Sequence, residues 1–157
     1  MRRHPAGSLL ITLGVVASDT KKDELQLFAR AHRRTLEALK VLAPEDTANA
    51  LAEMGVGAQG LAPDALGGDI QLAAAVLDGD VHAVILLRDP VLPLAGDPDT
   101  LMMLKVCDLE RVPIATNIAT AEVLIGHLAE VHGALSLPQN EPHPDAGPGR
   151  VIKFVER

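Results

Sequence analysis

Apolar and polar residues alternate in blocks along the chain, and these blocks predict strands and helices in turn. A continuous apolar run at 9–17 is typical of a strand buried on both faces. Over 21–39, apolar residues such as Leu25, Phe28 and Leu36 recur at helical spacing, which predicts an amphipathic helix. The short apolar segment 40–43 that follows is predicted to be the second strand.

The same alternation continues through the rest of the chain. We predict further strands at 55–62, 82–89 and 113–117, and further helices near 47–54 and over 69–79, 97–111 and 119–130. Strands that alternate with helices in this way favour parallel pairing, with the helices packed on both faces of the sheet. The predicted fold is therefore a single α/β domain with a parallel sheet of about five strands.

Short polar signals mark where several of these helices begin and end. Asp19 and Thr20 are candidate N-caps of the first helix, and Asp69, directly after two glycines, is a candidate N-cap of 69–79. Gly79 is placed to end that helix. The triplet 97–99, Asp-Pro-Asp, is typical of a helix start with proline at its first position.

The two ends of the chain differ from its centre. Arg2, Arg3 and the apolar run after them also resemble a secretory signal, but without 9–17 the α/β pattern would lack its first strand. Residues 138–149 contain four prolines and two glycines, which indicates a linker or loop. Residues 151–156 are an added strand, an oligomer contact or a frayed end. We therefore divide the chain into a domain at 1–130 and a proline-rich tail at 131–157.

Composition excludes several classes of function. The net charge of −7 and the near absence of aromatic residues argue against nucleic-acid binding, because a phosphate backbone would be repelled and bases would find no stacking platform. No apolar run reaches the roughly 18 residues that span a bilayer. A single cysteine, Cys107, suits a reducing cytoplasm and reads as a small core residue. The six histidines show no pair at i,i+4 spacing, so we expect no metal site.

In open α/β sheets, ligands bind beyond the carboxyl ends of the strands. In this chain, the segments after the predicted strands are rich in carboxylates: Asp19, Glu45, Asp46, Asp64, Asp69 and Asp99. Such a rim is most simply a solvated acidic surface. A second interpretation is a site for Mg²⁺, Ca²⁺ or a cationic metabolite.

Four segments in order resemble the methylglyoxal synthase family: GGD at 67–69 followed by Gln71, DGDVHAVILLRDP at 78–90, DPD at 97–99, and VPIATNIATAEVLI at 112–125. The resemblance is strongest over 66–125, and the order of elements extends it back to residue 9. It implies conversion of dihydroxyacetone phosphate to methylglyoxal and phosphate through an enediolate, in a hexamer, with no metal or organic cofactor. A related fold is a regulatory domain of carbamoyl phosphate synthetase.

The resemblance also implies roles for individual residues. Asp69 matches the catalytic base, which removes a proton next to the carbonyl, and Asp99 matches a second active-site aspartate. The residues implied in substrate binding are Asp19, Lys22, Thr47, Gly67 and Gly68. Of these, Lys22 and Thr47 are expected at the phosphate, and the two glycines are expected to keep the turn.

At several positions the chain departs from the family's pattern. Ser18 and Gly96 replace two histidines, of which the second is expected to polarise the substrate carbonyl. The segment 44–48, Pro-Glu-Asp-Thr-Ala, replaces a Thr-Gly-Thr-Thr-Gly phosphate loop, and the pair 63–64, Pro-Asp, replaces Ser-Gly. A carboxylate of this segment at about 4 Å from a phosphate charge, at an effective dielectric of about 20, would cost roughly 4 kcal/mol of binding energy for each pair of like charges. Loss of one positioned oxyanion donor typically lowers a rate by about 10² to 10³.

Three functions follow as hypotheses. The first is a methylglyoxal synthase-related protein whose lyase activity is impaired or lost, and the second is an active carbon–oxygen lyase that uses Asp69 as base. The third is a non-catalytic module that binds a small molecule. In each case we expect a small-molecule ligand, such as a phosphorylated triose, and a cytoplasmic homo-oligomer without nucleic-acid or membrane partners.

Overall fold

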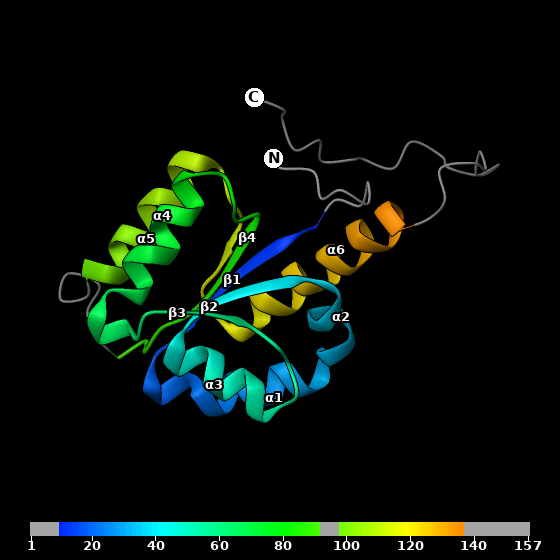
Figure 1. Ribbon diagram of the computed structural model, residues 1–157, viewed down its shortest axis with the longest axis horizontal. Coiled ribbons are helices and arrows are strands. Elements are labelled where there is room, and N and C mark those ends of the chain that lie inside the picture. The colour runs from blue at the N-terminus through cyan, green and yellow to red at the C-terminus, as the bar shows by residue number, and fades with distance from the viewer. Residues whose placement is uncertain (1–9, 92–97, 137–157) are drawn as a thin grey trace.

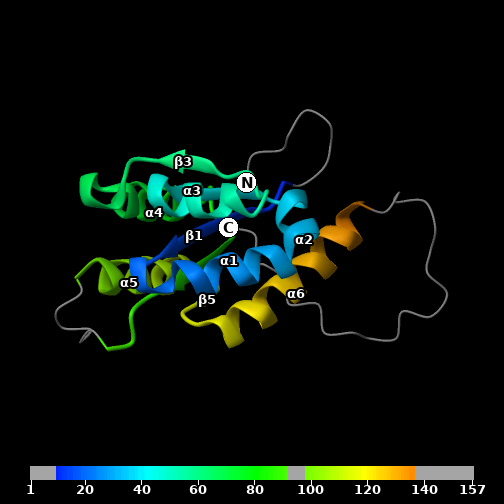
Figure 2. The same cartoon turned by 90° about the horizontal axis from the view of Figure 1, so that it is seen from below.

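The computed structural model describes residues 10–91 and 98–136, with side chains to 133, and these residues form one α/β domain (Figure 1). The centre of the described part is a five-stranded parallel sheet with strand order β3-β2-β1-β4-β5. The strands are β1 (Thr12–Ala17), β2 (Lys40–Pro44), β3 (Gln59–Leu61), β4 (Ala83–Leu87) and β5 (Ile114–Ala115). Figure 2 shows β3 and β5 at opposite edges of the sheet, with β1 between them. The predicted fold class is confirmed.

Helices cover both faces of this sheet, as predicted (Figure 1). The α-helices are α1 (Lys22–Ala31), α2 (Arg33–Ala38), α3 (Glu45–Glu53), α4 (Gly68–Leu77), α5 (Pro98–Glu110) and α6 (Ile118–Ser136). Two 3-10 turns, η1 (Asp19–Lys21) and η2 (Asp64–Leu66), precede α1 and α4. Helices α1, α2, α3 and α6 pack on one face, whereas α4 and α5 pack on the other.

The two central strands are buried on both faces because their side chains alternate between two hydrophobic clusters. Val15 and its partner Ile85 face the cluster under α1 and α6, whereas Val16 and its partner Leu86 face the cluster under α4 and α5. A strand buried on both sides needs apolar residues at every position. This explains the unbroken apolar runs that predicted β1 and β4.

The long helix predicted over 21–39 is instead two helices that meet at His32. The His32 backbone leaves helical geometry at φ −108° and ψ 20°. Its ring tilts against Phe28 at a centroid distance of 4.7 Å, and Nε2 lies 2.6 Å from Oε2 of Glu122 on α6. The break thus coincides with contacts to a helix distant in sequence, which helical periodicity alone does not reveal.

Other element boundaries also differ from prediction. Strands β3 and β5 are shorter than the segments 55–62 and 113–117. Helix α6 continues to Ser136, beyond the predicted end at 130. Residues 151–156, for which an added strand is one of three interpretations, lie outside the described residues, as do the prolines after 137. Within the described residues, no helix is both long and apolar enough to cross a membrane.

Candidate functional site

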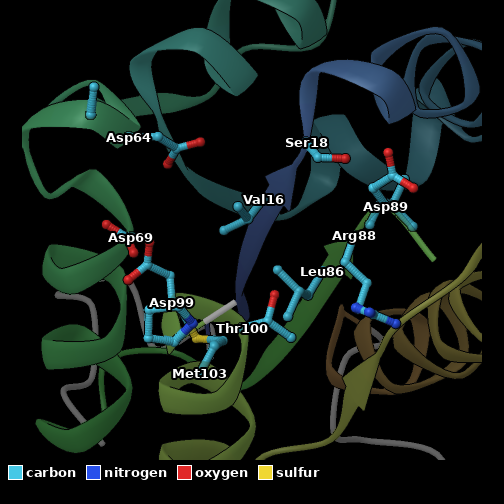
Figure 3. A pocket seen from close by; sticks show the side chains of 13 residues that line it. Val16, Ser18, Asp64, Asp69, Leu86, Arg88, Asp89, Asp99, Thr100 and Met103 are labelled. Atoms are coloured by element: carbon cyan, nitrogen blue, oxygen red, sulfur yellow. The ribbon is translucent and has the colours of Figure 1, made fainter. Parts of the chain in front are cut away.

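A cavity of about 410 Å³ opens at the carboxyl ends of β1 and β4, beside η2, α4 and α5 (Figure 3). Apolar side chains such as Val16, Leu86 and Met103 form part of its wall. The polar and charged residues that line it are Ser18, Asp64, Asp69, Arg88, Asp89, Asp99 and Thr100. The cavity therefore lies where ligands bind in open α/β sheets.

Asp69 sits in the first turn of α4 and points its carboxylate into this cavity (Figure 3). Its side chain does not cap the helix, because Gly67 is the N-cap and no side-chain cap hydrogen bond forms. The predicted capping role of Asp69 is therefore wrong. Asp69 is only 9% exposed, and its Oδ2 atom is buried without a hydrogen-bond partner in the described part of the chain.

Gly67 and Gly68 give Asp69 its position. Gly67 adopts a φ of +88°, in the left-handed region that favours glycine. A Cβ atom on Gly68 would lie 1.9 Å from the carbonyl oxygen of Ala62, so the turn leaves no room for a side chain. Neither glycine lines the cavity in the structure. Their geometry explains the turn before Asp69, and their predicted contact with substrate stays a prediction.

Asp64, in η2, is a second carboxylate in the same cavity (Figure 3). Its Oδ1 atom is buried and lacks a hydrogen-bond partner in the described residues. Burial raises the pKa of Asp64 above its usual value, and the nearby charges of Asp69 and Asp46 raise it further. The sequence indicated Asp64 only as a rim carboxylate and as a departure from the family pattern. That it lines the same cavity as Asp69 could not be predicted from those signals.

Asp99 is the second residue of α5 and also lines the cavity. The structure thus brings Asp69 and Asp99, the two residues implied in catalysis, to one site (Figure 3). Gly96 and Asp97 lie outside the described residues. Arg88 lines the same cavity, although its guanidinium is directed away from Asp64 and Asp69 in Figure 3.

The other predicted substrate-binding residues lie elsewhere. The Lys22 Nζ atom lies 2.8 Å from Oδ1 of Asp19, whose side chain is almost fully exposed, and neither residue lines the cavity. The Lys22 ammonium holds the pKa of the Asp19 carboxyl below its usual value. Thr47 is fully buried, and its hydroxyl accepts a hydrogen bond from the backbone N–H of Ala17 at 3.3 Å.

The candidate N-caps Asp19 and Thr20 lie in η1, and no side chain caps α1.

A smaller cavity of about 210 Å³ adjoins the first and shares Leu87 and Arg88 with it. Thr116 and Asn117, which follow β5, line this second cavity. Asn117 also accepts a hydrogen bond from the N–H of Thr120 at its Oδ1 atom, 3.0 Å away. The described residues contain no cluster of three or more His, Cys, Asp or Glu side chains arranged to hold a metal ion.

Comparisons with known proteins agree with this architecture. No family model matches the chain. Methylglyoxal synthase from Cupriavidus taiwanensis is 38% identical over 123 residues, which cover 78% of this chain and 92% of that protein. Methylglyoxal synthase from Burkholderia mallei is 39% identical over 118 residues, which cover 74% of this chain and 91% of that protein.

A solved structure gives the same result. The crystal structure of methylglyoxal synthase from Elizabethkingia anophelis matches with a TM-score of 0.67 at 26% identity, over 74% of this chain and 77% of that chain. The five-stranded parallel sheet and the cavity at its carboxyl edge therefore occur in a chain whose relatives are synthases. On its identity to these relatives, the chain belongs to the methylglyoxal synthase family.

Proposed function

We propose that this chain keeps the acid–base carboxylates of the methylglyoxal synthase family but has lost most or all turnover of dihydroxyacetone phosphate. In the proposal, Asp69 remains able to remove a proton next to a carbonyl, with Asp99 beside it in the cavity. The burial of Asp69 and its unpartnered Oδ2 atom support this role. A carboxylate oxygen whose lone pairs are not engaged in a hydrogen bond can accept a proton from a ligand.

The observation on which the proposal rests is Asp64 in the cavity. The family resemblance expects phosphate contacts at this position, where the chain supplies a carboxylate instead. Burial raises the pKa of Asp64, the nearby charges of Asp69 and Asp46 raise it further, and Lys22 lowers it. The two neighbouring carboxylates would also repel a phosphate bound beside Asp64. Repulsion between a phosphate dianion and an ionised carboxylate at about 4 Å weakens binding by roughly 4 kcal/mol per pair of charges, at an effective dielectric of about 20.

The groups expected to hold the phosphate are also engaged within the protein. Thr47 is fully buried and binds the Ala17 amide. Pro44 has no N–H, and the N–H of Glu45 lies 3.4 Å from the carbonyl oxygen of Ala62. Lys22 pairs with Asp19 on the surface, where solvent screens the attraction between the two charges and makes such a pair weak. Lys22 is thus the one predicted phosphate ligand that a triose phosphate could recruit at low cost.

The remaining sequence-based expectations are part of the same proposal. We propose a homo-oligomer, hexameric by resemblance to the family, that works in the cytoplasm and binds a small molecule without a metal or an organic cofactor. The buried, single Cys107 supports a reducing compartment.

The test is formation of methylglyoxal from dihydroxyacetone phosphate by the purified full-length chain, measured beside the Cupriavidus taiwanensis synthase. We expect a kcat/KM lower by about 10² or more, the factor that loss of one oxyanion donor alone would cause. The Asp69→Asn variant removes the base, and Asp108→Asn, an exposed acid on α5, is the matched control. A rate equal to that of the relative, and abolished by Asp69→Asn alone, would overturn the proposal.

A further inference from the structure

We propose that the cavity binds a small organic cation, whose ammonium group is held by the carboxylates of Asp64 and Asp69. The inference rests on the proposed function, since it names the ligand class for the same cavity after the loss of phosphate binding. A protonated primary amine is the simplest ligand of this class, because it offers three N–H donors to carboxylate oxygens.

The first observation is the unpartnered, buried carboxylate of Asp69. With 9% of the residue exposed and no hydrogen bond to Oδ2 in the described residues, Asp69 lacks the partner that buried polar atoms normally have. Figure 3 shows this carboxylate among the side chains that line the cavity. A donor supplied by a ligand would satisfy it.

The second observation is the position of Asp64. Its Oδ1 atom is likewise buried and unpartnered in the described part of the chain, and it faces the same cavity. Asp69 lines the same cavity, and its charge contributes to the raised pKa of Asp64. Two like charges at one site repel each other, whereas a cation between them would be attracted by both. The pair is thus arranged to select positive charge and to reject anions.

The cationic groups of Lys22 and Arg88 are not directed at the carboxylates of Asp64 and Asp69. Lys22 acts on Asp64 at a distance, but its Nζ atom pairs with Asp19 at 2.8 Å. Arg88 directs its guanidinium away from both carboxylates (Figure 3), and it also lines the second cavity. A bound cation would therefore meet little competition from the protein's own charges at the Asp64–Asp69 pair.

The rest of the cavity sets the size and polarity of the ligand. Val16, Leu86, Pro98 and Met103 provide an apolar part of the cavity wall. A volume of about 410 Å³ is at the small end of the range for ligand pockets. These features fit a short amine with a few carbon atoms, whose hydrocarbon part packs on the apolar wall.

The test is calorimetric titration of the full-length chain at pH 7 with three ligands of similar shape: n-butylammonium, 1-butanol and butyrate. We expect n-butylammonium to bind at least about tenfold more tightly than 1-butanol, and butyrate to give no saturable heat. Asp64→Asn and Asp69→Asn keep the side-chain shape but remove one charge each. Each should weaken n-butylammonium binding by about tenfold or more, the usual effect of losing a charged hydrogen bond.

Asp108→Asn should leave the binding unchanged, and thermal unfolding of every variant verifies that it folds. The proposal is overturned if n-butylammonium binds no better than 1-butanol, or if both cavity variants bind it as tightly as the wild type. Turnover of dihydroxyacetone phosphate is measured on the same sample. Absent turnover together with absent amine binding would overturn this inference alone, whereas efficient turnover would overturn the proposed loss of activity.

Discussion

The hydroxyl of Thr47, on α3, accepts a hydrogen bond from the backbone N–H of Ala17, the last residue of β1, at 3.3 Å. Thr47 is fully buried, so the contact joins the end of the central strand to the start of a neighbouring helix. The contact gives Thr47 a structural role at the position where the family resemblance predicts a phosphate ligand.

Replacement of Thr47 by valine should therefore lower stability. Valine matches the shape of threonine but leaves the buried N–H of Ala17 without its acceptor, which costs about 1–3 kcal/mol. Thr47→Ser keeps the hydroxyl and should lose less stability. Urea unfolding followed by circular dichroism measures both. A Thr47→Val variant as stable as wild type, with altered ligand binding, would favour the phosphate role instead.

Gly68 is predicted to be indispensable to the turn before Asp69. Alanine at 68 would place its Cβ 1.9 Å from the Ala62 carbonyl oxygen, a clash that only backbone movement relieves. We expect Gly68→Ala to lower the free energy of unfolding by about 3 kcal/mol.

The matched control is Gly126→Ala on α6, where a Cβ would meet no atom within 4 Å. Because alanine has the higher helix propensity, this change should raise stability by up to about 1 kcal/mol. Equal effects of the two substitutions in urea unfolding would show that the geometry at Gly68 is misjudged.

Asp64 should be a source of instability at neutral pH. Its pKa is raised in the folded protein, chiefly by burial, so the folded state holds this proton more tightly than the unfolded state does. The stability lost to Asp64 is therefore greatest above its folded pKa and vanishes below its usual value of 3.8.

Asp64→Asn should raise the Tm at pH 7 by about 2 °C, a modest figure because solvent partly screens this half-buried group. The gain should shrink as the pH falls toward 3.8. Differential scanning calorimetry of the two proteins across this range is the measurement. A gain that grows on acidification would contradict the assignment.

His82 should make the fold sensitive to acid. Its Nδ1 atom accepts a hydrogen bond from the N–H of Thr12 at 3.0 Å, and burial lowers the pKa of the ring below its usual value of 6.5. The unfolded chain therefore binds this proton more readily, so stability falls as the pH drops from 6.5 toward the folded pKa.

His82→Asn keeps an acceptor near Thr12 but does not titrate in this range. Urea unfolding at pH 7.5, 6.5 and 5.5 should give a flatter dependence of stability on pH for the variant than for the wild type. Parallel curves would show that His82 contributes nothing to the acid sensitivity of the fold.

Much of the fold could be predicted from the sequence, because its determinants are local. Strands β1 and β4 are apolar at nearly every position, and a strand buried on both faces needs that composition. The break at His32 could not be predicted in the same way, since the contact with Glu122 joins residues 90 apart in the chain.

The candidate site shows the same division between local and long-range determinants. The sequence placed Asp69 beside a helix start, but whether it caps that helix depends on the backbone of Gly67, which takes the cap position itself. The sequence also identified Thr47 by resemblance, but its hydrogen bond with Ala17 joins residues 30 apart in the chain and could not be predicted from local pattern. That Asp64 and Asp69 line one cavity depends on the fold of the turn between them.

The central claim, that the cavity no longer holds a triose phosphate, is tested most directly by calorimetric titration with dihydroxyacetone phosphate. The wild-type chain is predicted to show no saturable binding up to about 1 mM, and Asp64→Gly, which restores the residue expected in the family, is predicted to bind more tightly than wild type. Saturable binding by the wild type at about 0.1 mM or below, unchanged in Asp64→Gly, would contradict the claim.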